Sequence, residues 1–489
     1  MTISYGSTGT QSTHTNTITP TLVGSAGQLA VLQVVSGHPD DSIPSTPSGW
    51  ILAGSTSGGG STFASSAGPR RLTWFVRVLT GGDGNPTTAI PSGATGSLII
   101  GRIVSLSRTA GTDWRWATSF GDDQTSGTGF AAAGTTALSW QSGDMAIIGY
   151  GVASNADSFS AEAIAVTGVT FGTLTERADA AVTTGYGASV ALATSSVTAG
   201  TATLAPSLVA TLASASVGIA GVLRVREASS DVNATPQSVF PPRNLVSVTG
   251  LEADDIVTAT IYRQVGADRT VLRAANGIDV TGTDVLLRID AEQPFGVSLN
   301  YAAELVDLYG NVWTAFSGPI TSTVTSDVIS DAIRGIGAAV KVESPLEWSR
   351  SREATKFNAG GRIIVVGKKR SAPSTTMTVR TITDADGDAL NAVLDDLTEG
   401  VLLFRKQNSL SRLDGTYALT DDTESPNWYD QIRWFQLELQ STETWADVLE
   451  AAGFTLQDIA DNFDTLQDLA DFFTPGTLLD IALYDFGTV

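Results

Sequence analysis

The sequence contains no cysteine, which excludes disulfide bonds, thiolate metal sites and cysteine nucleophiles. It contains only two histidines, His14 and His38, both near the N-terminus. Most metal centres and general bases use histidine, so the usual catalytic residue types are scarce, although chemistry based on carboxylates alone stays open. We therefore expect neither a cofactor nor an enzymatic activity.

Basic residues are also few, with 28 Lys and Arg against 50 Asp and Glu and a net charge of −22. A chain this acidic is not expected to bind nucleic acid. The charge is uneven: residues 341–380 contain nine Lys or Arg against three Glu, whereas residues 443–489 contain ten acids and no base. The basic stretch is either a solvated surface or the contact site of an acidic partner.

Long hydrophobic runs are missing as well, because no apolar segment approaches the ~20 residues needed to span a bilayer. The first residues, Met1 to Tyr5, lack the basic segment and apolar segment of a signal peptide. We therefore expect no membrane insertion and no secretory leader.

The sequence is rich in glycine, with 50 residues placed among many short apolar runs, a composition typical of β structure with frequent turns. Within residues 72–78, the apolar residues Leu72, Trp74 and Val76 occupy alternate positions. This alternation predicts a strand with one fully apolar face. We predict a mainly β, multidomain protein.

Strand-like runs, turn clusters and prolines predict four folded regions separated by two linkers. In chain order these are a jelly-roll-like β-sandwich at 1–228, a linker at 229–235, an immunoglobulin- or fibronectin-like sandwich at 236–326, a linker at 327–340, an α+β domain at 341–440 and four short capped helices at 441–489. Within the α+β domain, apolar residues at helical spacing predict a helix over about 388–397.

The last 46 residues repeat one unit four times, starting at Thr444, Thr455, Thr465 and Thr477, each with Asp three residues later. This spacing is typical of a helix cap, and the apolar residues of each unit share one helical face. Helices this short are marginal alone in water, so they must dock on their own chain, on another copy or on a different partner. The predicted contact residues are the apolar Trp445, Leu456, Ile459, Phe463, Leu466, Leu469 and Phe473, with Lys368, Lys369 and Arg370 as basic counterparts.

Asp384, Asp386 and Asp388 match positions 1, 3 and 5 of an EF-hand calcium loop. The match then fails, because Ala389 stands where the loop needs Gly and Asp395 where it needs Glu. The alternative interpretation is a turn leading into a helix, with acids near the helix N-terminus. We favour the helix and keep calcium as the weaker candidate.

Five tryptophans lie in the first predicted region: Trp50, Trp74, Trp114, Trp116 and Trp140. Aromatic side chains in β-sandwiches either pack in the core or stack on sugar rings at the surface. Trp74 lies on the alternating strand and is expected in the core. Trp114 and Trp116 are the candidates for surface contact with glycan, whereas His14 and His38 lack any matching ligand cluster.

Several segments resemble minor tail proteins of long-tailed phages that infect actinobacteria. The matching segments of the first region are Pro47–Trp50, Arg71–Val78, Ser142–Asp144 and Val222–Arg226. Those of the later regions are Asp290–Gly296 with Tyr301, and Thr381–Leu390, Val401–Arg405 and Tyr417–Leu419. The resemblance is strongest over about 330–440, and these patterns contain no catalytic residue to transfer.

The resemblance implies a structural virion protein at the tail tip or baseplate, located in the virion tail. Its implied partners are copies of itself around the tail axis and other tail or baseplate proteins, with host cell-wall glycan as a further partner. The alternative is a carbohydrate- or cell-wall-binding adhesin built on the N-terminal sandwich. A glycosidase or peptidase using paired carboxylates is the least favoured reading, because no acidic pair lies in a recognisable motif.

Overall fold

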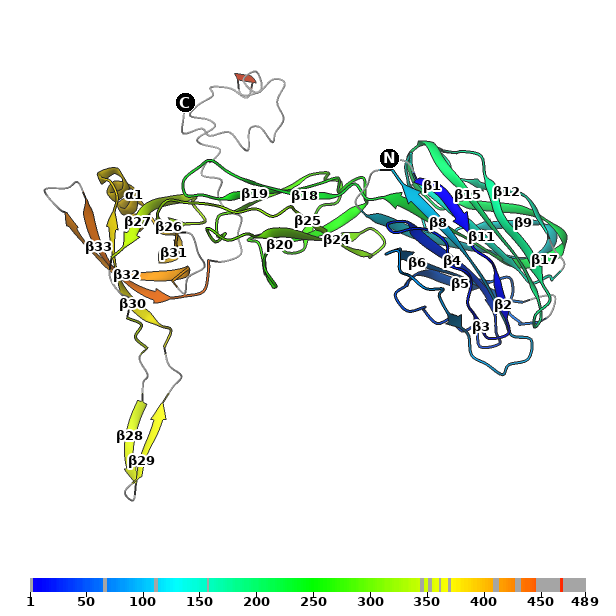
Figure 1. Ribbon diagram of the computed structural model, residues 1–489, viewed down its shortest axis with the longest axis horizontal. Coiled ribbons are helices and arrows are strands. Elements are labelled where there is room, and N and C mark those ends of the chain that lie inside the picture. Colours follow the sequence, from blue (N-terminus) through cyan, green and yellow to red (C-terminus); the bar gives the residue numbers. More distant parts are fainter. Residues whose placement is uncertain are drawn as a thin grey trace. The chain divides into compact units, whose positions relative to one another are not determined.

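A computed structural model describes residues 3–64, 68–109, 113–155, 158–343, 347–350, 354–359, 362–367, 371–407, 413–426, 432–445 and 467–468. The chain divides into two compact units, Met1–Ser229 and Ser230–Val489 (Figure 1). Strands account for 58% of the described residues and helix for 4%, which confirms a mainly β, multidomain protein.

The first sheet of the first unit has the order β1-β8-β4-β6-β5, with β2 also paired to β8. Its strands are β1 (Ile3–Thr8), β2 (Ser12–His14), β4 (Leu29–Gly37), β5 (Ile51–Gly58), β6 (Arg70–Val78) and β8 (Leu98–Arg108), and β3 (Thr17–Ile18) pairs separately with β7 (Thr88–Ala89). Every residue of the central strand β4 is buried, as expected for a mostly apolar strand with sheet neighbours on both sides, and the buried residues include the polar Gln33 and Ser36. The predicted strand at 72–78 is confirmed as part of β6, with Trp74 in the core.

The second sheet has the order β12-β17-β11-β15-β13, with β14 also on β15 and β9 also on β17. Its strands are β9 (Trp114–Ala133), β11 (Met145–Val152), β12 (Phe159–Ala165), β13 (Val169–Phe171), β14 (Thr175–Val182), β15 (Ala188–Gly200) and β17 (Ser207–Glu227), and β10 (Leu138–Trp140) pairs with β16 (Ala202–Leu204).

The two sheets of the first unit pack face to face at Gly149. A Cβ at that position would lie 2.5 Å from the amide nitrogen of Gln33 on β4 and 2.7 Å from the Trp74 ring on β6. Across the same interface, the Gln33 amide donates to the Ala191 carbonyl oxygen of β15 at 2.9 Å. The core of this unit is therefore the space between the sheets, and glycine permits their close approach.

The second unit begins with two small sheets, ordered β18-β19-β23 and β21-β20-β24-β25, with β22 on β20. Their strands are β18 (Asp231–Pro236), β19 (Asn244–Thr249), β20 (Ile256–Val265), β21 (Asp268–Val271), β22 (Ile278–Asp279), β23 (Leu286–Asp290), β24 (Asn300–Asp307) and β25 (Val312–Phe316). The predicted linker at 229–235 is wrong, because most of it is β18, paired antiparallel with β19. Its polar residues are exposed while Val232 is buried. In so short a segment one buried residue is not enough to reveal the alternation of a strand.

The chain then forms a closed barrel, β26-β27-β30-β33-β32-β31. Its strands are β26 (Asp327–Asp331), β27 (Ile336–Val342), β30 (Ser374–Thr381), β31 (Val401–Arg405), β32 (Gly415–Pro426) and β33 (Arg433–Ser441). The predicted linker at 327–340 is wrong, since it contains β26 and most of β27. Ser, Asp, Gly and Ile in mixed order made this stretch resemble a connection. One of these polar residues, Asp331, is buried, and its carboxylate accepts hydrogen bonds from the N–H groups of Ile333 at 2.8 Å and Thr398 at 2.7 Å.

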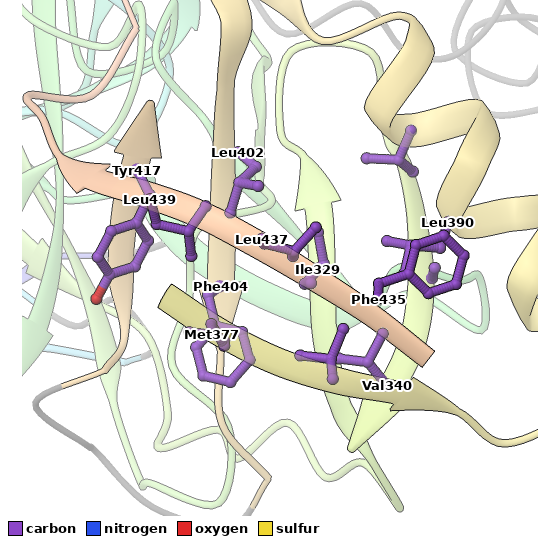
Figure 2. Packing of buried hydrophobic residues seen from close by; sticks show 13 residues of the cluster. Ile329, Val340, Met377, Leu390, Leu402, Phe404, Tyr417, Phe435, Leu437 and Leu439 are labelled. Atoms are coloured by element: carbon purple, nitrogen blue, oxygen red, sulfur yellow. The ribbon is translucent and has the colours of Figure 1, made fainter. Parts of the chain in front are cut away.

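The barrel core is a single apolar cluster that includes residues from all six barrel strands and from α1 (Asp384–Asp395) (Figure 2). Leu390 and Val393 of α1 are buried against it, which confirms the predicted apolar face of the helix. The helix begins four residues earlier than the predicted 388, because Thr383 and Asp386 form a reciprocal capping box. A short 3-10 turn, η1 (Thr398–Gly400), leads into β31.

A β-hairpin is inserted between barrel strands β27 and β30. It consists of β28 (Ala354–Ala359) and β29 (Arg362–Gly367), which pair antiparallel (yellow in Figure 1). Among the strands that the structure describes, these two pair only with each other.

Candidate interaction sites

Trp445, the first predicted contact residue of the C-terminal repeat, is buried in its own chain. Its ring packs in a cluster with Ala291 and Ala332 and with Val401 and Leu403 of β31, and only 3% of the residue is exposed. The indole N–H donates to the Thr398 carbonyl oxygen at 2.9 Å. The first copy of the repeat therefore starts from a fixed point on the second unit.

Arg273 and Glu292 hold the residues beside this indole. The Arg273 guanidinium lies 5.4 Å from the Trp445 ring centroid and donates to the Trp445 carbonyl oxygen at 3.2 Å. It also donates to the Thr444 hydroxyl at 2.7 Å, and that hydroxyl donates to the Glu292 carboxylate at 3.1 Å. Arg273 and Glu292 form an ion pair. The Thr444 hydroxyl, predicted to cap a helix, is thus engaged by side chains from 273 and 292.

The segment Asp290–Gly296, one of the segments that carry the resemblance, starts in a buried polar network. The Asp290 carboxylate accepts hydrogen bonds from Arg263 at 2.7 Å and from the Tyr301 hydroxyl at 2.8 Å. Asn244 donates to the same hydroxyl at 2.9 Å. Burial, reinforced by the Asp290 charge, raises the pKa of Tyr301 well above its usual range. Burial alone would lower the pKa of Arg263, but its interactions with Asp290, Tyr301 and Glu292 together outweigh burial and raise this pKa.

The end of the same segment ties these sheets to the barrel. The guanidinium of Arg405, at the end of β31, lies 4.3 Å from the Phe295 ring centroid. It donates to the Pro242 carbonyl oxygen at 3.2 Å and to the Gln293 side-chain oxygen at 3.2 Å. Together with the Trp445 cluster, these contacts form a joint between the small sheets and the barrel, defined here as Asp290–Gly296, Arg405 and Trp445. A planar buried guanidinium with several acceptors favours one fixed geometry.

The Asp384–Asp388 run forms the first turn of α1 rather than a calcium loop. The Asp386 carboxylate accepts from the Thr383 N–H at 2.8 Å and from the Thr383 hydroxyl at 2.7 Å. Asp384 and Asp388 each pair with Arg433 at 2.7 Å, and hydrogen bonds to these two acids raise the pKa of Arg433. The helix-start interpretation is confirmed. Within the described ranges, no group of three or more acids or histidines could hold a metal ion.

The prediction that Trp114 or Trp116 contacts glycan at the surface is wrong, because both are buried. The Trp114 indole donates to the Gly27 carbonyl oxygen at 3.1 Å, and the Arg108 guanidinium lies 5.2 Å from its ring centroid. Trp50, Trp74 and Trp140 are also in the core. A long β9 that pairs with β17 over most of its length places its first residues inside the sheet, which strand length alone would not reveal.

The two histidines act as local turn acceptors. The Nδ1 atom of His14 accepts from the Asn16 N–H at 3.2 Å, and that of His38 accepts from the Asp40 N–H at 3.1 Å.

The remaining predicted contact residues lie outside the described residues and stay predictions. They are Leu456, Ile459, Phe463, Leu466, Leu469, Phe473, Lys368, Lys369 and Arg370.

The structure adds a groove of about 710 Å³ on the outer wall of the barrel, which the sequence interpretation missed. Its lining is polar and includes Glu347, Ser349, Thr376, Thr378, Glu438 and Gln440. The sequence does indicate a polar outer face on β30, because Thr376 and Thr378 alternate with the buried Met377 and Val379. The groove itself depends on which strands become neighbours, and that pairing is not local.

No known protein-family model matches this chain, and no curated protein matches it either. No helix among the described residues is long and apolar enough to cross a membrane.

Proposed function

We propose that this chain is a structural virion protein, a minor tail protein at the tip or baseplate of a phage tail, present in several copies. The proposal rests on the resemblance of its segments to such proteins and on the joint that one of those segments builds. A chain in which the buried Arg405 connects the barrel to the neighbouring β-sheets suits a structural role in an assembly. We further propose that residues 1–228 form a jelly-roll-like sandwich and 236–326 an immunoglobulin- or fibronectin-like one.

The hairpin β28–β29 is the observation that carries the proposal of assembly. A two-stranded hairpin is at best marginally stable alone in water, and no other described strand extends this one. It lies inside the most basic part of an acidic chain. Such a hairpin is best explained by a protein surface that covers it in the assembled state.

The proposal is tested on purified virions of the phage that encodes the chain. Mass spectrometry of washed particles should detect the protein, and gold-labelled antibodies raised against it should mark the tail tip by electron microscopy. A matched control uses the same antibodies after absorption with the purified protein. Particles that lack the chain, or label confined to the capsid, would contradict the proposal.

A second candidate, a carbohydrate- or cell-wall-binding adhesin, is favoured by one groove on the first unit. This groove of about 380 Å³ is lined by apolar residues such as Val169 and Phe171, with Glu162 among them. One carboxylate oxygen of Glu162 is buried without a hydrogen-bond partner, and Glu162 adds to the effect of burial in raising the pKa of Glu176. A groove that contains both a carboxylate and an aromatic ring is suited to a sugar.

Binding of the full-length protein to a glycan array and to cell-wall fragments tests this second candidate. Binding that is lost in Glu162→Gln and kept in Glu252→Gln, a change of an acid outside this groove, would support it. A wild-type protein that binds no glycan on the array and no cell-wall fragment would contradict the adhesin candidate.

A further inference from the structure

The floor of the groove on the barrel wall is the outward face of β30, β33 and β32, which are neighbours in the closed barrel. Outward residues of β30 stand directly opposite outward residues of β33. The facing pairs are Ser374 with Gln440, Thr376 with Glu438, and Thr378 with Gln436. Since residues on one face of a strand recur at every second position, these pairs form three successive polar rungs along the groove.

Most polar side chains of this floor have no partner within the described chain. The Ser349 and Ser374 hydroxyls at the rim bond each other at 2.8 Å. Among the described residues, no hydrogen bond or ion pair engages the side chains of five others that line the groove, namely Thr376, Thr378, Gln436, Glu438 and Gln440. Thr and Gln side chains both donate and accept, and a carboxylate accepts. The floor therefore offers donors and acceptors together to a ligand.

The charge of the lining disfavours an anionic ligand. Its described residues include Glu347 and Glu438 and contain no Lys, Arg or His. Proteins usually recognise phosphate and carboxylate groups with Arg or Lys side chains. A phosphorylated or acidic ligand would instead meet two carboxylates here.

The lining and the topology also disfavour apolar ligands and peptides. Ala372 and Leu439 are the apolar residues among the described lining, and Leu439 is 1% exposed, whereas pockets for apolar ligands are mostly hydrophobic. A peptide that extends a sheet needs a free edge. In the closed barrel, β30, β33 and β32 each have a strand neighbour on both sides. A neutral ligand rich in hydroxyl groups fits this chemistry best.

We propose that the groove on the barrel wall binds a neutral oligosaccharide. Sugar hydroxyls donate to the Glu438 carboxylate and exchange hydrogen bonds with Thr376, Thr378 and Gln436. The described lining contains no aromatic ring, so each site binds without ring contacts and the expected Kd is on the order of 1 mM. This site is separate from the groove at Glu162 on the first unit, and it does not depend on a place for the chain in a phage tail.

Ligand-observed NMR titration of the full-length protein tests the site. The probes are neutral tetramers of glucose, galactose, mannose and N-acetylglucosamine, and the galacturonic acid tetramer is the acidic counterpart of the galactose tetramer. One variant carries Thr376→Val and Thr378→Val, which removes two hydroxyls and keeps the branched shape suited to a strand. A second carries Gln436→Ala. The matched control carries Thr270→Val and Thr314→Val, two exposed strand threonines of the second unit that do not line the groove.

We expect at least one neutral tetramer to bind the wild-type protein, and the double Thr variant to raise its Kd about tenfold. Gln436→Ala should weaken binding of the same tetramer, whereas the Thr270 and Thr314 control and Glu162→Gln should bind it like the wild type. The galacturonic acid tetramer should bind more weakly than the galactose tetramer, because Glu347 and Glu438 repel it. Circular dichroism checks that every variant is folded.

Binding of none of the four neutral tetramers at about 20 mM overturns the inference. Wild-type affinity in both groove variants also overturns it, as does loss of binding in Glu162→Gln, which would assign the sugar to the first unit. Tighter binding of the acidic tetramer than of its neutral counterpart contradicts the chemistry of the lining. Failure of the proposed function is distinguishable, because it appears as absence of the chain from purified virions, whatever the protein binds in solution.

Discussion

The burial of Trp445 is expected to attach residues 441–445 to the second unit. The substitution Trp445→Ala measures how much this burial contributes to the stability of that unit. The residue is 3% exposed among Ala291, Ala332, Val401 and Leu403. Burying about 200 Å² of an indole at about 25 cal/mol per Å² corresponds to roughly 5 kcal/mol, and truncations of buried Trp cost about 3–5 kcal/mol. We expect the free energy of unfolding of the second unit to fall by about 3 kcal/mol.

Urea unfolding followed by far-ultraviolet circular dichroism measures this change. The two compact units give two transitions where their midpoints differ, and only the transition of the second unit should move. Hydrogen exchange should also become faster at the N–H groups of residues 441–445.

Trp434→Ala is the matched control, because this tryptophan is on barrel strand β33 yet 37% exposed. Its loss should cost less than about 1 kcal/mol. Equal costs for the two substitutions, or a cost below about 0.5 kcal/mol for Trp445→Ala, would mean that the indole does not occupy this pocket in solution.

Three further predictions concern stability. Asp290→Asn leaves the partly buried Arg263 without the buried carboxylate that pairs with it and should destabilise the second unit by about 3–5 kcal/mol in urea unfolding; an effect below about 1 kcal/mol would contradict the network. Gly149→Ala places a methyl group against Gln33 and Trp74 and should lower the free energy of unfolding of the first unit by about 1–3 kcal/mol. An unchanged thermal unfolding transition would contradict this prediction. Burial raises the pKa of Tyr417 from 10.0 to about 12, so the unfolded chain loses this proton first and the stability of the second unit should fall as pH rises between these values. Tyr417→Phe should make that alkaline decline less steep in urea titrations at stepped pH, with the part due to Tyr301 remaining, and an unchanged slope would exclude the contribution of the Tyr417 hydroxyl.

Patterns of neighbouring residues predict the elements that depend only on their own segment of the sequence. The alternation at 72–78 marks β6, and the spacing of Leu390 and Val393 marks the buried face of α1. The helix α1 begins at Asp384 rather than at the predicted 388, because Thr383 and Asp386 cap its N-terminus. The signal is a Thr followed three residues later by an Asp, and the C-terminal repeat has the same spacing.

The linkers were mispredicted because polar residues serve strands there. Asp331 is buried and satisfied by backbone N–H groups of Ile333 and Thr398, and the second of these lies far along the chain. The burial of Trp114 and Trp116 is not evident from the sequence because nothing local reveals that β9 pairs with β17 along most of its length. Barrel closure, the joint at Arg405 and the groove on the barrel wall all depend on contacts between residues distant in sequence, which residue patterns do not encode.

A cryo-EM map of the intact virion is the most direct examination of this protein as a repeated structural element of the tail. The proposal predicts density for the two compact units at the tail tip, in several copies related by rotation about the tail axis. A map in which the tail tip contains no density for this chain, or only one copy of it, would contradict the proposal.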